Sequence, residues 1–186
     1  MTTRKPFRIA MLGASGTGKT TLAQMVSEHF GIEINPVGAR SVSRSMGFDS
    51  PYDVDKAGKR AEFQRRLLEE KTAWEMDHLA QGFVTDRTPL DNLAYTMLHD
   101  VKAVDEKFLQ NAYEGTGLYT HILYCPVDVF IDVANDPARV ADLTYHRLFD
   151  ATIHGLLRQV WLWVTRIDVS TISARSIVVK NVLGEP

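Results

Sequence analysis

Cysteine is almost absent from this chain of 186 residues, because Cys125 is the only one. A scaffold held together by intramolecular disulfides is therefore excluded, and a lone thiol is typical of a reducing compartment. An excess of one charge is also missing, since 21 basic and 23 acidic side chains give a formal net charge of -2. This balance disfavours a domain that grips duplex DNA through one large basic face, although it is compatible with a local basic groove.

Long hydrophobic runs are missing as well. No stretch approaches the roughly 20 apolar residues needed to cross a bilayer, since Arg158 and Gln159 interrupt the best candidate. The short apolar run near the N-terminus ends at Gly13 with no small-residue cleavage site before Lys19, which argues against a signal peptide. We therefore expect a cytoplasmic protein with no membrane partner.

Internal repeats, low-complexity segments and long linkers are not found either, so we expect a single domain over residues 1–186. A hydrophobic fraction of 45% excludes disorder over most of the length. Short apolar runs alternate with longer helical patterns, which predicts an α/β fold with a parallel sheet. We expect three layers, with five parallel strands covered by helices on both faces.

The pattern assigns most elements directly. Strands are expected at residues 7–12, 32–37, 83–85, 119–125 and 163–169. Helices are expected at residues 19–30, 51–81 (with a break near Gly58), 89–98, 105–113, about 140–164, and 172–183. The β-branched run at residues 177–179 favours a competing strand at 176–182, but the alternation of elements favours a final helix.

Residues 13–20 carry the strongest motif. They read Gly-Ala-Ser-Gly-Thr-Gly-Lys-Thr and match G-x-x-x-x-G-K-[ST] at every fixed position, between an expected buried strand and an amphipathic helix. In this loop backbone N–H groups cradle phosphates, Lys19 bridges the β- and γ-phosphates, and the Thr20 hydroxyl ligates Mg²⁺. The motif predicts binding of ATP and Mg²⁺. The residues expected to contact the nucleotide are Gly13, Ala14, Ser15, Gly16, Thr17, Gly18, Lys19, Thr20 and Thr21.

The end of the expected strand at 83–85 indicates which chemistry the loop serves. Asp86 and Arg87 follow this strand, where a motor ATPase usually has an Asp-Glu pair, and no Asn-Lys-x-Asp guanine-reading motif is present. An acid beside an arginine suits phosphoryl transfer to a bound acceptor. The acid can hold the metal or accept the acceptor proton, and the arginine can neutralise charge.

The block Thr-Asp-Arg-Thr-Pro-Leu-Asp-Asn-Leu-Ala-Tyr at residues 85–95, downstream of this P-loop, resembles the small P-loop kinases of nucleosides and nucleotides. It is most similar to the nicotinamide-riboside-kinase-like group and to the deoxynucleoside monophosphate kinases of bacteriophages. The resemblance implies a nucleotide-kinase-like fold with a short lid at about residues 136–147, in which Arg139 would stabilise the transferring charge. It also places Asp86 at the metal or general-base position and Arg87 at the acceptor.

Further acceptor contacts follow from the same resemblance. Arg40 matches an arginine after the second strand, Gln64 a base-contacting glutamine on the long helix, and Asp91 a position near the same pocket. The segment 40–45 is a basic, hydroxyl-rich loop, and through it Arg44 joins Arg40 as a candidate for gripping acceptor phosphates. The chain departs from the family at Asn35, because related kinases often carry an acidic residue in this region. Asp86 is thus the best candidate base.

These patterns predict an ATP- and Mg²⁺-dependent phosphotransferase acting on a nucleoside or nucleoside monophosphate, as in phage nucleotide metabolism, where the location would be the host cytoplasm. A DNA kinase that phosphorylates the hydroxymethyl group of a modified pyrimidine, such as 5-hydroxymethyluracil, is an alternative. A regulatory P-loop ATPase without an acceptor is another. The sequence leaves the oligomeric state and the choice of acceptor open.

Overall fold

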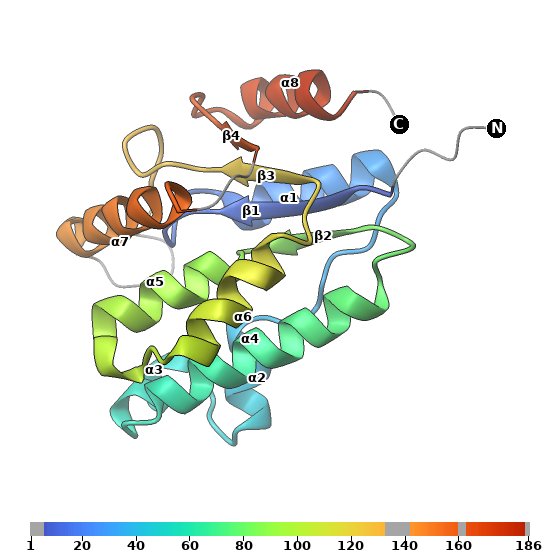
Figure 1. Ribbon diagram of the computed structural model, residues 1–186. Helices are drawn as coiled ribbons and strands as arrows, with labels where there is room; N and C mark the ends of the chain where they lie inside the picture. Colours follow the sequence, from blue (N-terminus) through green and yellow to red (C-terminus); the bar gives the residue numbers. More distant parts are fainter. Residues whose placement is uncertain (1–5, 133–141, 160–162, 185–186) are drawn as a thin grey trace.

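The computed structural model describes residues 6–132, 142–159 and 163–184. Its sheet has four strands, β1 (Arg8–Leu12), β2 (Phe83–Asp86), β3 (His121–Tyr124) and β4 (Val164–Arg166), in the order β2-β1-β3-β4. All three pairings are parallel, as Figure 1 shows. The α/β class with a parallel sheet is therefore confirmed.

The prediction of five strands is wrong for the described residues. The segment 32–37 forms only an isolated parallel bridge between Ile34 and Val84. Two backbone hydrogen bonds of 2.8 Å support it, from Asn35 N to the Val84 carbonyl and from Val84 N to the Glu33 carbonyl. The next donor of a parallel ladder would be the N–H of Val37, which instead donates to Asn35 Oδ1 at 2.9 Å, so the pairing does not grow into a strand.

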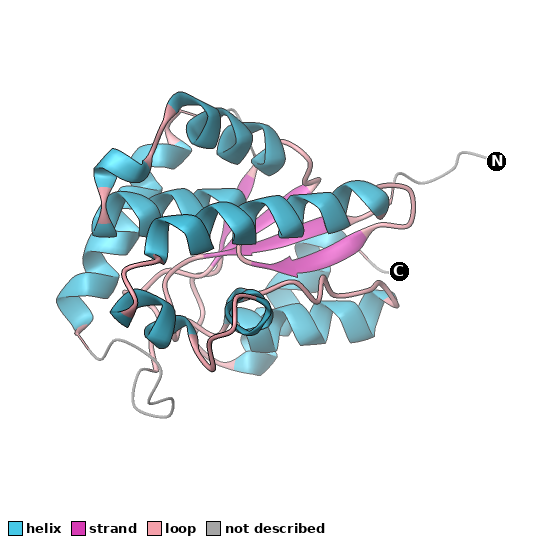
Figure 2. Cartoon of the chain, turned by 90° about the horizontal axis from the view of Figure 1, so that it is seen from below, coloured by secondary structure: helices cyan, strands magenta, loops and turns pink. Residues whose placement is uncertain are grey.

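Helices cover both faces of the sheet, as predicted, and the alternation of side chains along β1 explains why. Ile9 and Met11 join the cluster formed with α1 (Lys19–Phe30) and α8 (Ile172–Leu183). Ala10 and Leu12 join the cluster on the opposite face, beneath α4 (Arg60–Asp77), α5 (Pro89–His99), α6 (Glu106–Thr116) and α7 (Leu143–Leu157). Figures 1 and 2 show these layers. Each fully buried side chain of leucine size contributes roughly 1.5–3 kcal/mol.

The predicted helix 51–81 is two helices, α3 (Pro51–Lys56) and α4, with Gly58 at φ 69° between them. The Ser50 hydroxyl caps α3 by accepting a 3.3 Å hydrogen bond from Asp53 N. The expected loop at 40–45 is helical instead, as α2 (Ala39–Ser45). Ser41 Oγ accepts from Gly38 N at 2.9 Å and starts this helix, and the core residue Val42 holds it against Val54 and Phe63.

The C-terminal part has the predicted final helix and not the competing strand at residues 176–182. β4 lies within the strand expected at residues 163–169, and α8 has the bounds expected for the helix, residues 172–183. The helix predicted at 140–164 is shorter, because α7 ends at Leu157 and Val164 already belongs to β4. A 3₁₀ turn, η1 (Val101–Ala103), joins α5 to α6. Within the described ranges, no helix combines the length and apolarity that a bilayer crossing requires.

Candidate active site

The P-loop joins the end of β1 to the first turn of α1, at the carboxyl edge of the sheet. Gly13, Gly16 and Gly18 have φ values of 139°, 84° and 81°, which side chains with a Cβ rarely adopt. A Cβ at Gly13 would also overlap the carbonyl oxygen of Cys125. The loop geometry therefore depends on glycine both for backbone conformation and for close approach to the end of β3.

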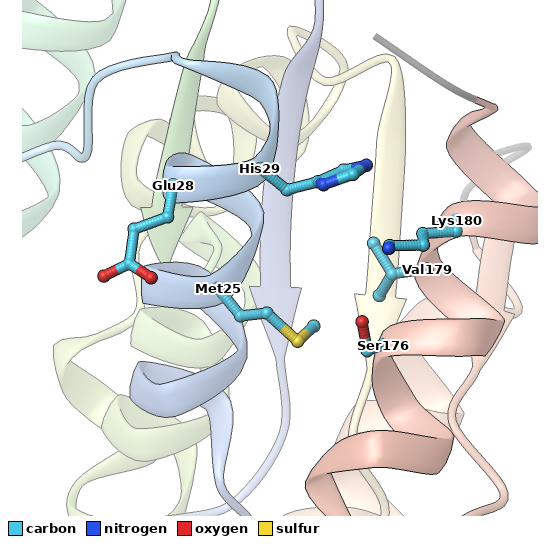
Figure 3. A pocket seen from close by; sticks show the side chains of 6 residues that line it. All are labelled: Met25, Glu28, His29, Ser176, Val179 and Lys180. Carbon is cyan, nitrogen blue, oxygen red and sulfur yellow. The ribbon is translucent and has the colours of Figure 1, made fainter.

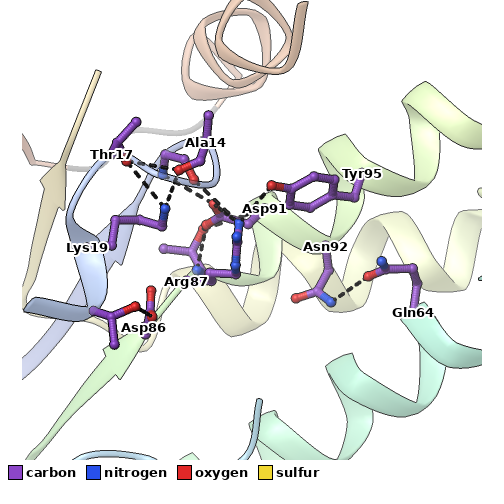
Figure 4. A network of polar contacts seen from close by, with 12 residues as sticks. Ala14, Thr17, Lys19, Gln64, Asp86, Arg87, Asp91, Asn92 and Tyr95 are labelled. Atoms are coloured by element: carbon purple, nitrogen blue, oxygen red, sulfur yellow. Dashed lines mark hydrogen bonds and ion pairs between the residues drawn. The ribbon is translucent and has the colours of Figure 1, made fainter. Parts of the chain in front are cut away.

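Lys19 lies inside this loop and is only 4% exposed. Its Nζ donates to the Ala14 carbonyl and, at 3.4 Å, to Thr17 Oγ1 (Figure 4). Burial lowers the pKa of Lys19 to about 8, and the nearby positive charge of Arg87 acts in the same direction. The ammonium group is thus held where a phosphate chain would offer it a compensating negative charge.

Thr20 and Asp86 meet at the open edge of the loop. Thr20 Oγ1 donates to Asp86 Oδ2 at 2.5 Å, while Asp86 Oδ1 is buried and has no hydrogen-bond partner among the described residues. Burial would raise the pKa of Asp86, but the charges of Lys19 and Arg87 bring it below its usual value. A carboxylate oxygen without a partner beside a hydroxyl is a hard oxygen pair that fits Mg²⁺, which keeps several waters and takes phosphate oxygens as its other ligands.

Arg87 follows Asp86 at the end of β2, but its side chain contacts Tyr95 and Gly13 and not Thr20. Its Nη1 donates to Tyr95 OH at 3.1 Å and to the Gly13 carbonyl at 3.5 Å, and it lies 3.7 Å from Asp91 Oδ1. The guanidinium also stacks over the Tyr95 ring, 5.0 Å from its centroid. Although burial opposes its charge, Tyr95, Asp91 and Asp86 raise the pKa of Arg87, so the side chain is a fixed cation.

Asp91 is fully buried and binds backbone on two sides. Its Oδ1 accepts from Gly13 N at 3.2 Å, and its Oδ2 accepts from the amide and hydroxyl of Thr88 at 2.7 and 2.9 Å. It therefore joins the start of α5 to the start of the P-loop. Burial raises the pKa of Asp91, and the charge of Arg87 opposes this shift.

The remaining candidates lie farther along the helices. Gln64 is buried on α4, where its Oε1 accepts from Asn92 Nδ2 of α5 at 2.9 Å (Figure 4). Arg40 and Arg44 are exposed on α2. The structure thus brings Lys19, Thr20, Asp86, Arg87 and Asp91 together and pairs Gln64 with a second amide. Arg139 and the first part of the expected lid lie outside the described residues.

Two polar residues that the sequence analysis did not single out belong to this region. Arg175 of α8 is 1% exposed and donates from Nη1 to the Thr17 carbonyl at 2.8 Å. Lys71 of α4 is 2% exposed and donates from Nζ to the Asp86 carbonyl at 2.8 Å. Each shares a buried helix face with apolar residues, Arg175 with Val179 and Leu183 at intervals of four. In the sequence, each is a charged residue at a helix position where the pattern of apolar residues expects a buried side chain, and this signal could have identified both.

Two hollows in the surface lie away from this site. A hollow of about 280 Å³ lies between the second half of α1 and α8 and is lined by Met25, Glu28, His29, Ser176, Val179 and Lys180 (Figure 3). A second hollow of about 480 Å³ lies between α4 and α6. Neither is lined by a residue of the P-loop or by Asp86 or Arg87. Among the described side chains, no group of three or more His, Cys, Asp or Glu could hold a metal ion.

Gly13→Ala is expected to lower the free energy of unfolding by about 2–4 kcal/mol, because the new Cβ meets the Cys125 carbonyl at a strained φ. Nucleotide binding should fall with it. Gly155→Ala is the matched control, since this exposed glycine of α7 has no atom within 4 Å of an added Cβ. Alanine there should raise stability by up to about 1 kcal/mol. Urea unfolding compares the two variants, and equal stabilities would contradict the prediction.

The fold and the P-loop define the class of small P-loop proteins with a nucleotide-kinase fold. Residues 8–175 match the family described as AAA domain, AAA_28, and because this match covers most of the chain, the chain belongs to that family. It is 30% identical over 141 residues to the tRNA dimethylallyltransferase of Prochlorococcus marinus (strain MIT 9211), an alignment that covers 69% of this chain. The alignment covers only 40% of that curated relative.

Solved structures share the fold at low identity. Deoxyadenosine kinase from M. mycoides with bound dCTP has a TM-score of 0.62 and 16% identity, covering 95% of this chain and 98% of the kinase. The NadR protein in complex with NR has a TM-score of 0.68 and 15% identity, covering 95% of this chain and 48% of NadR. Shikimate kinase from Acinetobacter baumannii has a TM-score of 0.57 and 18% identity, covering 96% and 93%. The resemblance to small P-loop kinases is therefore confirmed at the level of fold.

Proposed function

We propose that this protein is an ATP- and Mg²⁺-dependent phosphotransferase whose acceptor is a nucleoside or a nucleoside monophosphate. The observation that carries the proposal is the divergence of Asp86 and Arg87 at one strand end. Asp86 meets Thr20 on the donor side, 2.5 Å between oxygens, while Arg87 turns toward Tyr95 and the first residue of the P-loop. A pair arranged in this way can serve a donor and an acceptor at once.

In this mechanism the loop amides and Lys19 hold the β- and γ-phosphates, and Thr20 and Asp86 would hold Mg²⁺, which supplies charge neutralisation on the phosphate oxygens. An acceptor oxygen, either a hydroxyl of a nucleoside or a phosphate oxygen of a nucleoside monophosphate, forms the new bond to the γ-phosphorus as the bond to the β–γ bridging oxygen breaks. ADP leaves with that bridging oxygen. Where the acceptor is a hydroxyl, Asp86, kept ionised by Lys19 and Arg87, accepts its proton. Where the acceptor is a phosphate, its ionised oxygen attacks without a base, and in both cases Arg87 neutralises charge on the acceptor or on the transferring group.

The test is ADP release from ATP and Mg²⁺ with a panel of acceptors: free nucleosides, each deoxynucleoside monophosphate and nicotinamide riboside. One free acceptor should stimulate ADP release at least tenfold over the rate without acceptor, and the phosphorylated product should appear in equal amount. Slow hydrolysis that no acceptor changes would contradict the proposal and favour a regulatory ATPase.

Two polymer acceptors belong in the same assay. Arg40 and Arg44 are exposed on one short helix, which is compatible with phosphates of a nucleic-acid strand, so DNA with and without hydroxymethylated pyrimidines is included. The similarity to a tRNA dimethylallyltransferase adds tRNA with dimethylallyl diphosphate in place of ATP, and for this pair the readout is the pyrophosphate released and the dimethylallyl group bound to tRNA. Transfer only to modified DNA, or only of the dimethylallyl group to tRNA, would reassign the substrate while keeping the P-loop as the phosphate site.

A further inference from the structure

We propose that Lys71 is a positioning residue that holds the peptide unit between Asp86 and Arg87 and thereby keeps Arg87 in its left-handed conformation, with its side chain at Tyr95 and Gly13. The proposal rests on the proposed function for its catalytic consequence, but the conformational part stands on geometry alone. Lys71 lies on α4, outside the P-loop and outside every motif of the sequence, yet it is almost completely buried.

The surroundings of Lys71 direct its amino group to one carbonyl. Glu75, one turn further along α4, accepts from Asn35 Nδ2 at 3.1 Å and from Tyr119 OH at 2.9 Å. Lys71 Nζ instead donates to the Asp86 carbonyl at 2.8 Å. Burial lowers the pKa of Lys71, whereas the charges of Glu75 and Asp86 oppose this shift. Burying an amino group costs free energy unless it is hydrogen-bonded, and the bond to the Asp86 carbonyl supplies this compensation for Lys71.

The bonded carbonyl belongs to a peptide unit that is held at both ends. Its C=O, from Asp86, accepts from Lys71, and its N–H, from Arg87, donates to the Met11 carbonyl of β1 at 3.0 Å. The orientation of this plane sets φ of Arg87, which is 84°. Arg87 is the one non-glycine residue with positive φ in the described part of the chain. Such a conformation persists only where neighbouring contacts enforce it.

This peptide orientation has a consequence for the site. Successive residues of a regular strand point to opposite faces of the sheet, but Arg87 has left the strand geometry, and its guanidinium reaches Tyr95 and Gly13. A rotation that relieved the positive φ would break the bonds of this peptide unit to Lys71 and Met11. Any part of the rotation that ψ of Asp86 did not compensate would move the Arg87 side chain away from Tyr95 and Gly13. The amino group of Lys71 is the contact from α4 that opposes this rotation.

A double-mutant cycle on thermal unfolding tests the conformational part. Lys71→Met keeps the length of the side chain and removes the donor to the Asp86 carbonyl. Unlike Lys19→Met (see Discussion), it also leaves the buried carboxylate of Glu75 without the neighbouring positive charge, so the unfolding midpoint should fall by about 5 °C in the wild-type background. The same fall is expected in the Arg87→Ala background, which loses the guanidinium but keeps a Cβ at positive φ. In the Arg87→Gly background the strain is absent, and the fall should be smaller by about 2 °C.

Equal falls in all three backgrounds would overturn the proposal, because Lys71 would then stabilise the fold without regard to the Arg87 backbone. If Lys71→Met does not fold, Lys71→Gln, which keeps an N–H donor on a shorter side chain, goes through the same cycle. The fall in unfolding midpoint that Lys71→Gln causes should be smaller in the Arg87→Gly background than in the Arg87→Ala background. This readout needs no substrate, so it gives an answer even if the chain phosphorylates nothing.

The catalytic part is tested with the acceptor found by the panel. Below its unfolding midpoint, Lys71→Met should lower kcat about tenfold while changing KM for ATP less than threefold, because the P-loop keeps its own contacts. An unchanged kcat would overturn the positioning role. An inactive wild-type protein with the expected unfolding pattern would instead contradict the proposed function and leave the conformational role of Lys71 supported.

Discussion

Replacing Lys19 by methionine is expected to abolish phosphoryl transfer and, at the same time, to stabilise the ligand-free protein. The side chain is 4% exposed, and burial lowers its pKa from 10.5 to about 8. Keeping the ammonium charged inside the folded protein at neutral pH therefore costs on the order of 3 kcal/mol. Methionine fills similar space without a charge, so the free energy of unfolding should rise by part of that amount. Activity should fall at least 100-fold because the charge that faces the phosphates is gone.

The gain in stability from Lys19→Met should depend on pH in a direction that follows from the two pKa values of Lys19. The folded protein releases the Lys19 proton near pH 8 and the unfolded chain near 10.5, so the folded state binds fewer protons between these values. The contribution of Lys19 to stability therefore increases as pH rises through this window, and the advantage of Lys19→Met should be largest below pH 8 and vanish near pH 10.5. Urea unfolding of both proteins at pH 7 and pH 10 measures it.

Lys180→Met is the matched control, because Lys180 is exposed on α8 and its loss should leave activity unchanged. A Lys19→Met variant less stable than the wild type at both pH values would contradict the prediction. It would mean that the hydrogen bonds from Lys19 to Ala14 and Thr17 outweigh the cost of burying the charge.

Local sequence signals account for most of the sheet and for the geometry of the P-loop. The apolar run predicted β1, and the glycine-rich motif predicted the loop and the start of α1 after Gly18. Each of these features depends only on residues that are neighbours in the sequence. The prediction of a fifth strand failed for a comparable local reason, since the next backbone donor, Val37 N, bonds to the Asn35 side chain and the ladder ends after one bridge. The helix at Ala39–Ser45 was missed because the N-cap residue is Gly38, which has no capping side chain; instead its N–H donates to Ser41 Oγ.

The contacts of Asp91, Gln64 and Lys71 could not be predicted to the same degree, because they join residues far apart in sequence. Asp91 contacts Gly13 across 78 positions, and Gln64 contacts Asn92 across 28. Nothing in residues 60–77 alone indicates that the amino group of Lys71 would meet the Asp86 carbonyl. Such pairs follow from how α4 and α5 pack on the sheet, and single-sequence patterns do not encode that packing.

Removal of the Arg87 guanidinium is expected to damage use of the acceptor far more than use of ATP. Arg87 is held by Tyr95 and Asp91 on the side of the strand end opposite to Thr20, so Arg87→Ala should lower kcat/KM for the acceptor about 100-fold. KM for ATP should change less than threefold, because Lys19 and the loop amides remain. Steady-state kinetics with each substrate varied in turn measure both constants.

Two variants separate the charge of Arg87 from its placement. Tyr95→Phe removes the 3.1 Å hydrogen bond to Nη1 but leaves the guanidinium and the ring beneath it, so the loss in kcat/KM for the acceptor should be only a few-fold. Arg158→Ala, at the exposed end of α7, controls for the loss of one positive charge and should have no effect. Equal losses for ATP and the acceptor in Arg87→Ala would assign Arg87 to the donor phosphates. Lys71 holds the peptide of Arg87 and Tyr95 holds its side chain, so Arg87 is fixed in place before any acceptor binds. We therefore expect the loss of kcat/KM in Arg87→Ala to be as large as the loss caused by removing a donor from a preformed anion-binding site.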